Sequence, residues 1–94
     1  MPISIKVDLA VVRAKLPLRG LADVTLKWSD EELTIRRCAV FQKEGQPPWA
    51  SLPRLLIEKN GTKTYVPVID LPRELKKRVL EEILTSYGRQ RDAH

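Results

Sequence analysis

The sequence predicts an α+β fold, in which a small antiparallel β-sheet of about five strands is followed by one C-terminal amphipathic helix. Three observations support this prediction. The segment Ile3–Val11 alternates apolar and polar residues, Asn60-Gly61 separates two apolar runs, and Arg73–Tyr87 repeats apolar residues at the helical period. One face of this helix is expected to dock on the sheet, and the other to meet solvent or a partner.

The first strand places five apolar side chains on one face: Ile3, Ile5, Val7, Leu9 and Val11. The connector Arg13–Gly20 carries positive charges around a proline and a glycine, which is typical of a surface loop. Such a loop could contact phosphate, or it could be an ordinary exposed cationic loop. A second strand follows, with an inward face formed by Ala22, Val24, Leu26 and Trp28, and Ser29–Glu32 is expected to turn the chain.

The third strand, which is expected to begin at Leu33, changes phase along its length. Leu33 and Ile35 share one parity, whereas Cys38 and Val40 share the other. Keeping all four on one face requires one extra residue at Arg36-Arg37, as a β-bulge provides. These two arginines are therefore candidate functional residues. The alternative is that they are splayed across the strand with ordinary salt-bridge partners.

The middle of the chain contains a loop, Gln42–Pro48, and a short segment, Trp49–Pro53. We interpret Trp49 as a core or interface plug rather than a platform for base stacking. The pair Asn60-Gly61 predicts a type I′ hairpin. In the corresponding register Glu58 faces Lys63 and Leu56 faces Tyr65, and both pairings are favourable. Because Pro67 cannot donate a ladder hydrogen bond, the last strand is expected at an edge or with a bulge.

The closing helix has start and stop signals as well as periodicity. Asp70 or Leu71 can cap it, Pro72 suits its first turn, and Gly88 is a typical stop. Its apolar face is formed by Leu75, Val79, Leu80, Ile83, Leu84 and Tyr87. Lys76 lies within this apolar arc, where it either overhangs the sheet edge or extends its charge into water.

Composition limits the class of protein. With 94 residues the chain has room for one domain, and 17 Lys and Arg against 12 Asp and Glu give a net charge of +5. This charge favours polyanions such as nucleic acid, although a soluble domain with a basic surface is the plain alternative. The single cysteine, Cys38, cannot form an intramolecular disulfide and is expected to be buried in a reducing compartment. No apolar run is long enough to span a membrane.

Catalytic and metal-binding residues are not evident. The only histidine, His94, is the last residue, which argues against Ser-His or Cys-His catalysis and against a multi-histidine metal site. The carboxylate pairs Glu31-Glu32 and Glu81-Glu82 are expected to be solvated, and no glycine-rich phosphate loop is present. We therefore expect no enzyme, no cofactor, no metal and no small-molecule substrate.

Several segments resemble the stage V sporulation protein G (septation protein, SpoVG) family. They are Leu18–Leu26, Leu33–Val40, Trp49–Pro53 and the closing helix that ends at Tyr87. The resemblance spans nearly the whole chain, so residues 1–88 are expected to form one domain of this type and residues 89–94 a flexible basic tail. One departure is Arg54–Ile57, where the family tends to continue with polar, basic residues. This departure argues against phosphate contacts there and for an altered interface.

The resemblance implies a homodimeric, cytoplasmic bacterial protein that binds DNA or RNA and regulates septation, sporulation, capsule or virulence genes. It further implies that the basic residues of the closing helix, which here are Arg73, Lys76, Lys77 and Arg78, contact nucleic acid. The predicted β-bulge adds Arg36 and Arg37 to the candidate nucleic-acid-binding residues. The alternative function is a protein-interaction or structural dimer module that does not bind nucleic acid, because acidic and basic residues nearly balance from Asp70 to His94.

Overall fold

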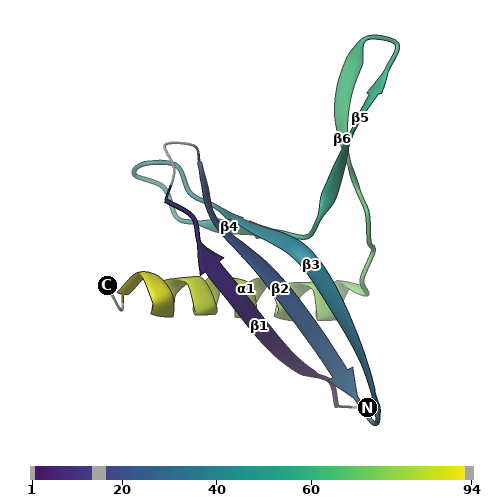
Figure 1. The fold of residues 1–94 in the computed structure, drawn as a ribbon, viewed down its shortest axis with the longest axis vertical. Coiled ribbons are helices and arrows are strands. Elements are labelled where there is room, and N and C mark those ends of the chain that lie inside the picture. Colours follow the sequence, from purple (N-terminus) through teal and green to yellow (C-terminus); the bar gives the residue numbers. More distant parts are fainter. Residues whose placement is uncertain (1, 14–16, 93–94) are drawn as a thin grey trace.

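The described residues form six β-strands and one α-helix, which confirms the predicted α+β class (Figure 1). The computed structural model describes residues 2–13 and 17–92. In chain order the elements are β1 (Ser4–Val11), β2 (Leu18–Trp28), β3 (Glu31–Phe41), β4 (Trp49–Ser51), β5 (Arg54–Lys59), β6 (Thr62–Pro67) and α1 (Arg73–Asp92). All the strand pairings are antiparallel, as predicted.

The first four strands form one sheet in the order β1-β2-β3-β4, and α1 lies across one face of it (Figure 1). The core between sheet and helix is built from alternating strand residues and from one stripe of the helix. It comprises Leu9, Ala22, Val24, Leu26, Ile35, Cys38, Val40, Leu52, Val79, Ile83 and Tyr87. The inward positions expected of the first two strands are thus confirmed, because they are buried or half-buried.

The opposite face of the sheet is called the open face, because no helix packs on it in the described ranges; only Arg54 of β5 and Tyr65 of β6 border it at one end. Register and shared surface hollows place on it Lys6, Asp8, Ala10, Leu21, Asp23, Thr25, Thr34, Arg36, Arg37, Ala39, Phe41 and Trp49. Trp49 is 40% exposed and stacks on Phe41, with ring centroids 5.6 Å apart. Of the two positions expected for Trp49, in the core or at an interface, the core position is therefore wrong.

The bulge predicted in the third strand is confirmed. Ala22 pairs with Cys38 and Val24 with Ile35, so one residue of β2, Asp23, faces two residues of β3. Arg37 takes a positive φ of 62°, which a bulge position tolerates at some cost. The extra residue returns Cys38 and Val40 to the face that packs on α1, where both are fully buried.

Two boundaries of the predicted loops need correction. The expected loop Arg13–Gly20 is shorter, because β2 already begins at Leu18, and residues 14–16 lie outside the described ranges. Similarly, β3 begins at Glu31, because the turn needs only Ser29 and Asp30.

The helix continues past the stop expected at Gly88 and runs to Asp92. Glycine disfavours a helix by only about 1 kcal/mol relative to alanine, so packing can override it. Here the last turns are fixed by Tyr87, which is buried, donates its hydroxyl to Oε1 of Gln42 at 3.3 Å and lies under the guanidinium of Arg91. The predicted tail thus begins as helix, and His94 lies outside the described residues.

The predicted hairpin is confirmed, with Glu58 paired with Lys63, Leu56 paired with Tyr65, and both turn residues, Asn60 and Gly61, at positive φ. However, β5 and β6 form a separate two-stranded sheet, so the expectation of a single sheet of about five strands is wrong. Pro53, which has no backbone N–H, separates β4 from β5 and so interrupts the ladder there. We call Arg54–Pro67 the arm. It projects away from the sheet and helix (Figure 1).

Candidate nucleic-acid interface

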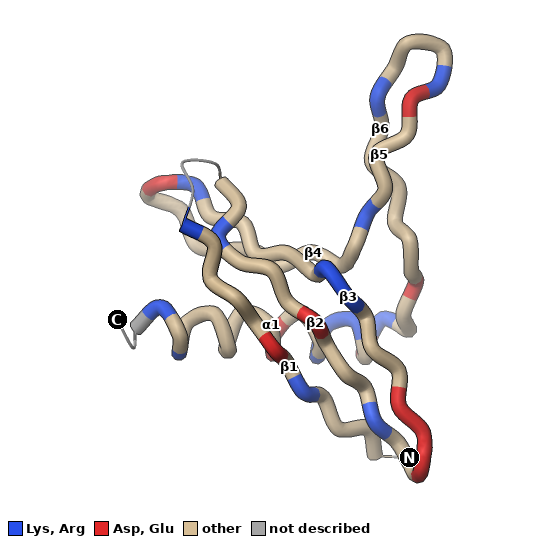
Figure 2. Tube along the Cα trace, viewed as in Figure 1, with Lys and Arg blue, Asp and Glu red and all other residues tan. Residues whose placement is uncertain are grey.

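The first turns of α1 carry four of the predicted site residues. The carbonyl of Pro72 accepts the first helical hydrogen bond, from the amide of Lys76 at 2.8 Å, so Pro72 itself takes the cap position expected of Asp70 or Leu71. Arg73, Lys76 and Lys77 are all exposed. Figure 2 shows the resulting group of basic residues at the start of the helix.

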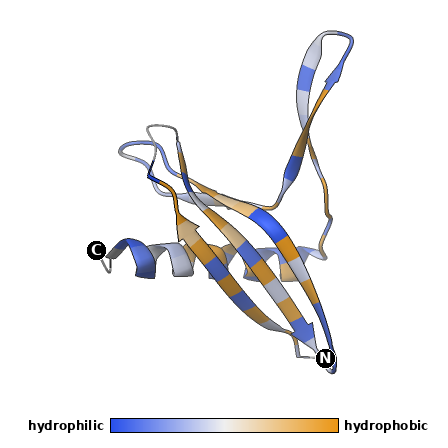
Figure 3. Cartoon of the chain, in the orientation of Figure 1, coloured by the Kyte–Doolittle hydropathy of each residue, from blue (hydrophilic) through white to orange (hydrophobic). Residues whose placement is uncertain are grey.

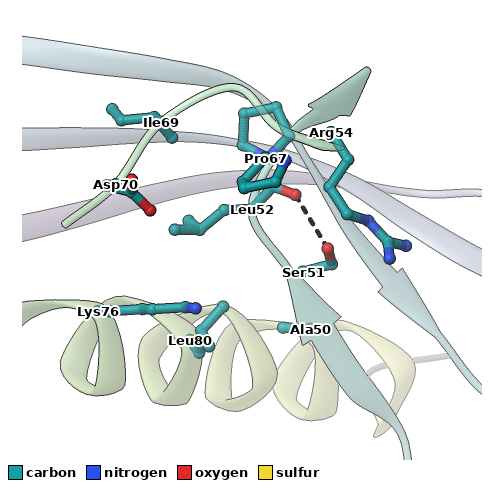
Figure 4. Close-up of a pocket in the computed structure, with 10 residues that line it drawn as sticks. Ala50, Ser51, Leu52, Arg54, Pro67, Ile69, Asp70, Lys76 and Leu80 are labelled. Carbon is teal, nitrogen blue, oxygen red and sulfur yellow. Dashed lines mark hydrogen bonds between the residues drawn. The ribbon is translucent and has the colours of Figure 1, made fainter. Parts of the chain in front are cut away.

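A surface hollow of about 220 Å³ lies between this first turn, β4 and the base of the arm (Figure 4). Its lining comes from segments that are far apart in the sequence: Ala50, Ser51, Leu52, Pro53, Arg54, Pro67, Ile69, Asp70, Lys76 and Leu80. Lys76 lines the hollow from the helix and Arg54 lines it from the arm, with the Arg54 guanidinium pointing away from Lys76, and Asp70 is the one acidic residue of the lining. Lys76 therefore overhangs the edge of the sheet, which was one of the two positions expected for it.

Arg54 connects this hollow to the open face. It also lines a second hollow, of about 150 Å³, together with Arg37, Phe41 and Tyr65. Its guanidinium lies over the Tyr65 ring, 5.2 Å from the centroid. Three cationic residues, Lys76, Arg54 and Arg37, thus line two neighbouring hollows that share Arg54. Sequence reasoning missed Arg54; the available signal was its position directly after Pro53, where the resemblance leads one to expect basic residues.

Arg78 is not part of this group. Its guanidinium donates to the carbonyl oxygen of Ile3, just before β1, at 3.1 Å. Residues two apart on a helix point to different sides, so Lys76 and Arg78 cannot reach the same phosphate. The four predicted helix cations are therefore divided between two sides of α1.

The predicted arginine pair of β3 lies on the open face, away from α1. Arg36 forms a salt bridge with Asp23, with 3.1 Å between Nη1 and Oδ2, so the alternative of an ordinary salt-bridge partner is correct for this residue. The Arg37 amide donates to the other oxygen of Asp23 at 3.3 Å. Arg37 lines two hollows, and its guanidinium forms no hydrogen bond or ion pair within the described ranges. Of the pair, Arg37 is thus the better placed to bind an anion.

The basic surface offers cations and no reactive group. The one thiol of the chain, Cys38, is buried beneath the sheet and not on this surface, and its burial, reinforced by the charge of Asp23, raises its pKa to about 11. The thiol is therefore protonated and unreactive at neutral pH. Residues 2–13 and 17–92 contain no group of three or more His, Cys, Asp or Glu placed to hold a metal ion. What the arrangement can do is neutralise phosphate groups.

Among the described residues, no helix is both long and apolar enough to cross a membrane. A scan against protein-family models found no match, and searches of curated proteins and of solved structures likewise found none.

Proposed function

We propose that this chain is a nucleic-acid-binding regulatory protein of the stage V sporulation protein G type, which acts on DNA or RNA as a homodimer in the bacterial cytoplasm. The observation that supports it best is that Lys76 of α1 and Arg54 of the arm line the same hollow, while Arg73 and Lys77 are exposed on the same first turns of the helix. Segments from the helix and from the arm thus contribute to one basic surface. The net charge of +5 acts in the same direction.

Phosphate contacts dominate the binding that we propose. Helix N-termini favour phosphate through unpaired amides, and Arg73 follows directly after Pro72 at such a terminus. The surface has few aromatic residues and no known base-reading motif, so sequence selectivity is modest. A homodimer carries the basic surface twice, which raises the affinity for a long polyanion without any new contact.

The test is fluorescence anisotropy of labelled duplex DNA, single-stranded DNA and RNA, titrated with the purified protein at several salt concentrations. Micromolar or tighter binding is expected, with log affinity falling linearly against log salt, and the slope counts the phosphates neutralised. Absence of binding to all three probes at low salt, with the protein shown to be folded by circular dichroism, would overturn the proposal.

Charge-reversal variants locate the surface. The double variant Arg54→Glu with Lys76→Glu is expected to lose at least tenfold in affinity, because both side chains line the proposed phosphate site. The matched control is Lys27→Glu with Lys43→Glu, which makes the same change of net charge at exposed positions outside this hollow. Equal losses in both variants would show that only net charge matters. A second helix variant, Lys77→Glu with Arg78→Glu, tests the original helix assignment.

A second candidate function is a protein-interaction or structural dimer module. The exposed apolar side chains of the arm favour it, because such patches mark interaction surfaces. In this case the charge keeps the protein soluble, and neither the parent nor the variant Arg54→Glu with Lys76→Glu binds nucleic acid in the titrations. The titrations above therefore separate the two candidates.

A further inference from the structure

The arm exposes an unusual amount of apolar surface. Its large hydrophobic residues are between 38% and 60% exposed: Leu55, Leu56, Ile57 and Tyr65. The adjoining Val68 is 63% exposed. Figure 3 shows apolar residues in this projecting segment. Soluble monomers seldom leave a contiguous apolar patch of this kind in water.

The arm also lacks a core of its own. Cross-strand partners lie on the same side, so one face carries Leu55, Ile57 and Val66 and the other carries Leu56, Tyr65 and Pro67. The Cα atoms of β5 and β6 come within 8 Å of each other but not of any other described helix or strand. An isolated two-stranded hairpin is at best marginally stable in water. Packing on a further surface would stabilise it.

The exposed area is large enough to form an interface. A compact monomer of 10.8 kDa exposes about 5,500 Å², whereas this chain exposes 7233 Å². Its radius of gyration is 14.5 Å, where a compact chain of this length has about 12.4 Å. A standard protein–protein interface buries about 800 Å² on each partner. The excess surface therefore exceeds what a stable dimer needs.

The open face of the four-stranded sheet provides a complementary surface. Leu21 is 42% exposed near the start of β2, next to Ala10 and Ala39 on the neighbouring strands, and the stacked pair of Phe41 and Trp49 lies at the same end of the face. One chain thus presents an apolar arm and an apolar patch at one end of the open face, while the rest of that face is polar and charged. A twofold axis would cover both surfaces at once, because the arm of the first chain then contacts the open face of the second, and the arm of the second contacts the open face of the first.

We infer that the arm of each chain packs on the open face of a second copy, so that two arms are exchanged across a twofold axis. This inference rests on the homodimer of the proposed function and assigns the surface that forms it. Insertion of the arm into a nucleic-acid groove is the competing use. It is disfavoured because both faces of the arm are apolar along its middle, whereas its cations lie at the two ends, with Arg54 at the base and Lys59 and Lys63 beside the turn.

The first test is the molar mass in solution, measured by light scattering after size exclusion over a range of concentrations and without nucleic acid. The parent chain is expected at twice 10.8 kDa. Ile57→Glu in the arm and Leu21→Glu on the open face are each expected to weaken association at least tenfold, because each buries a charge in the interface. The matched control is Leu33→Glu, at a 43% exposed leucine outside both surfaces, which is expected to remain dimeric.

A second test identifies which surfaces meet. Thr64→Cys places a thiol on the arm and Thr25→Cys places one on the open face, while the native Cys38 is buried and unreactive. Oxidising a mixture of the two variants is expected to link one chain of each kind. Links between two arms alone, or a monomeric parent at every concentration, would overturn the inference. So would an Ile57→Glu variant that stays dimeric and loses nucleic-acid affinity, which would assign the arm to nucleic acid.

These outcomes are independent of phosphate binding. The helix variant Lys77→Glu with Arg78→Glu changes residues outside the arm and the open face, so it is expected to keep the parent mass. If it does so while losing affinity for DNA or RNA, the dimer surface and the phosphate surface are separate. If the parent binds nucleic acid but is monomeric, the dimer fails while the phosphate assignment stands.

Discussion

The carboxylate of Asp23 on β2 accepts the backbone amide of Arg37 on β3, with 3.3 Å between nitrogen and Oδ1. Its second oxygen accepts the side chain of Arg36 at 3.1 Å. One acidic residue thus holds both arginines of the bulge. The bulge in turn keeps Cys38 and Val40 on the buried face, so this polar contact fixes the register of the core.

Replacing Asp23 by alanine is expected to lower the free energy of unfolding by about 1 kcal/mol, since the amide of Arg37 and the charge of Arg36 lose their acceptor. Urea denaturation followed by circular dichroism measures this change. The matched control is Asp8→Ala, because Asp8 lies directly opposite Asp23 and like charges in that position repel. The control is expected to leave stability unchanged or slightly higher. Equal losses in both variants would contradict the role given to Asp23.

Replacing Gly88 by alanine is expected to stabilise the protein by about 0.5–1 kcal/mol, because Gly88 lies inside a continuous helix and a Cβ atom there meets nothing within 4 Å. If Gly88 instead ended the helix in a left-handed conformation, alanine would destabilise it. The control is Gly61→Ala in the hairpin turn, where φ is 78° and a loss is expected. Thermal unfolding of the two variants distinguishes the alternatives.

Much of the fold could be predicted because it depends on local pattern. The change of parity between Ile35 and Cys38 located the bulge, and Asn60-Gly61 fixed the register of the hairpin. The end of the helix could not be predicted from Gly88, because the deciding contacts of Tyr87 with Gln42 and Arg91 are tertiary or lie beyond the expected stop.

The candidate site was only partly predictable for a similar reason. A sequence pattern shows that Lys76 and Arg78 belong to one helix, but only the packing shows that they lie on different sides of it. That Arg54 and Lys76 line the same hollow depends on where the folded chain places the base of the arm relative to the first turn of α1. The separation of the arm from the main sheet likewise depends on where β4 stops, at Ser51, just before Leu52 and Pro53.

The stability of the protein is expected to fall between about pH 9 and pH 11 because of Cys38. Its pKa is raised from 9.0 to about 11 in the folded chain, so the unfolded chain loses the thiol proton first as pH rises. Below pH 9 the thiol is protonated in both states and this contribution is fully present. The variant Cys38→Ala has no thiol and therefore lacks this pH-dependent contribution. The free energy of unfolding of the parent should thus fall relative to that of the variant by up to about 2 kcal/mol from pH 8 to pH 10.5. Denaturation midpoints at these two pH values measure the narrowing, and a constant difference would contradict the assignment.

The two arginines Arg54 and Arg36 are expected to differ in their contribution to nucleic-acid binding. Arg54 lines the hollow that Lys76 enters, whereas Arg36 is already paired with Asp23. Arg54→Ala is therefore expected to weaken duplex binding by several-fold and to reduce the slope of log affinity against log salt by about 1, the value for one phosphate contact. Arg36→Ala makes the same change of charge and is expected to leave the slope unaltered. Anisotropy titrations of both variants at three salt concentrations measure the slopes, and a reduced slope for Arg36→Ala alone would move the phosphate site to the open face.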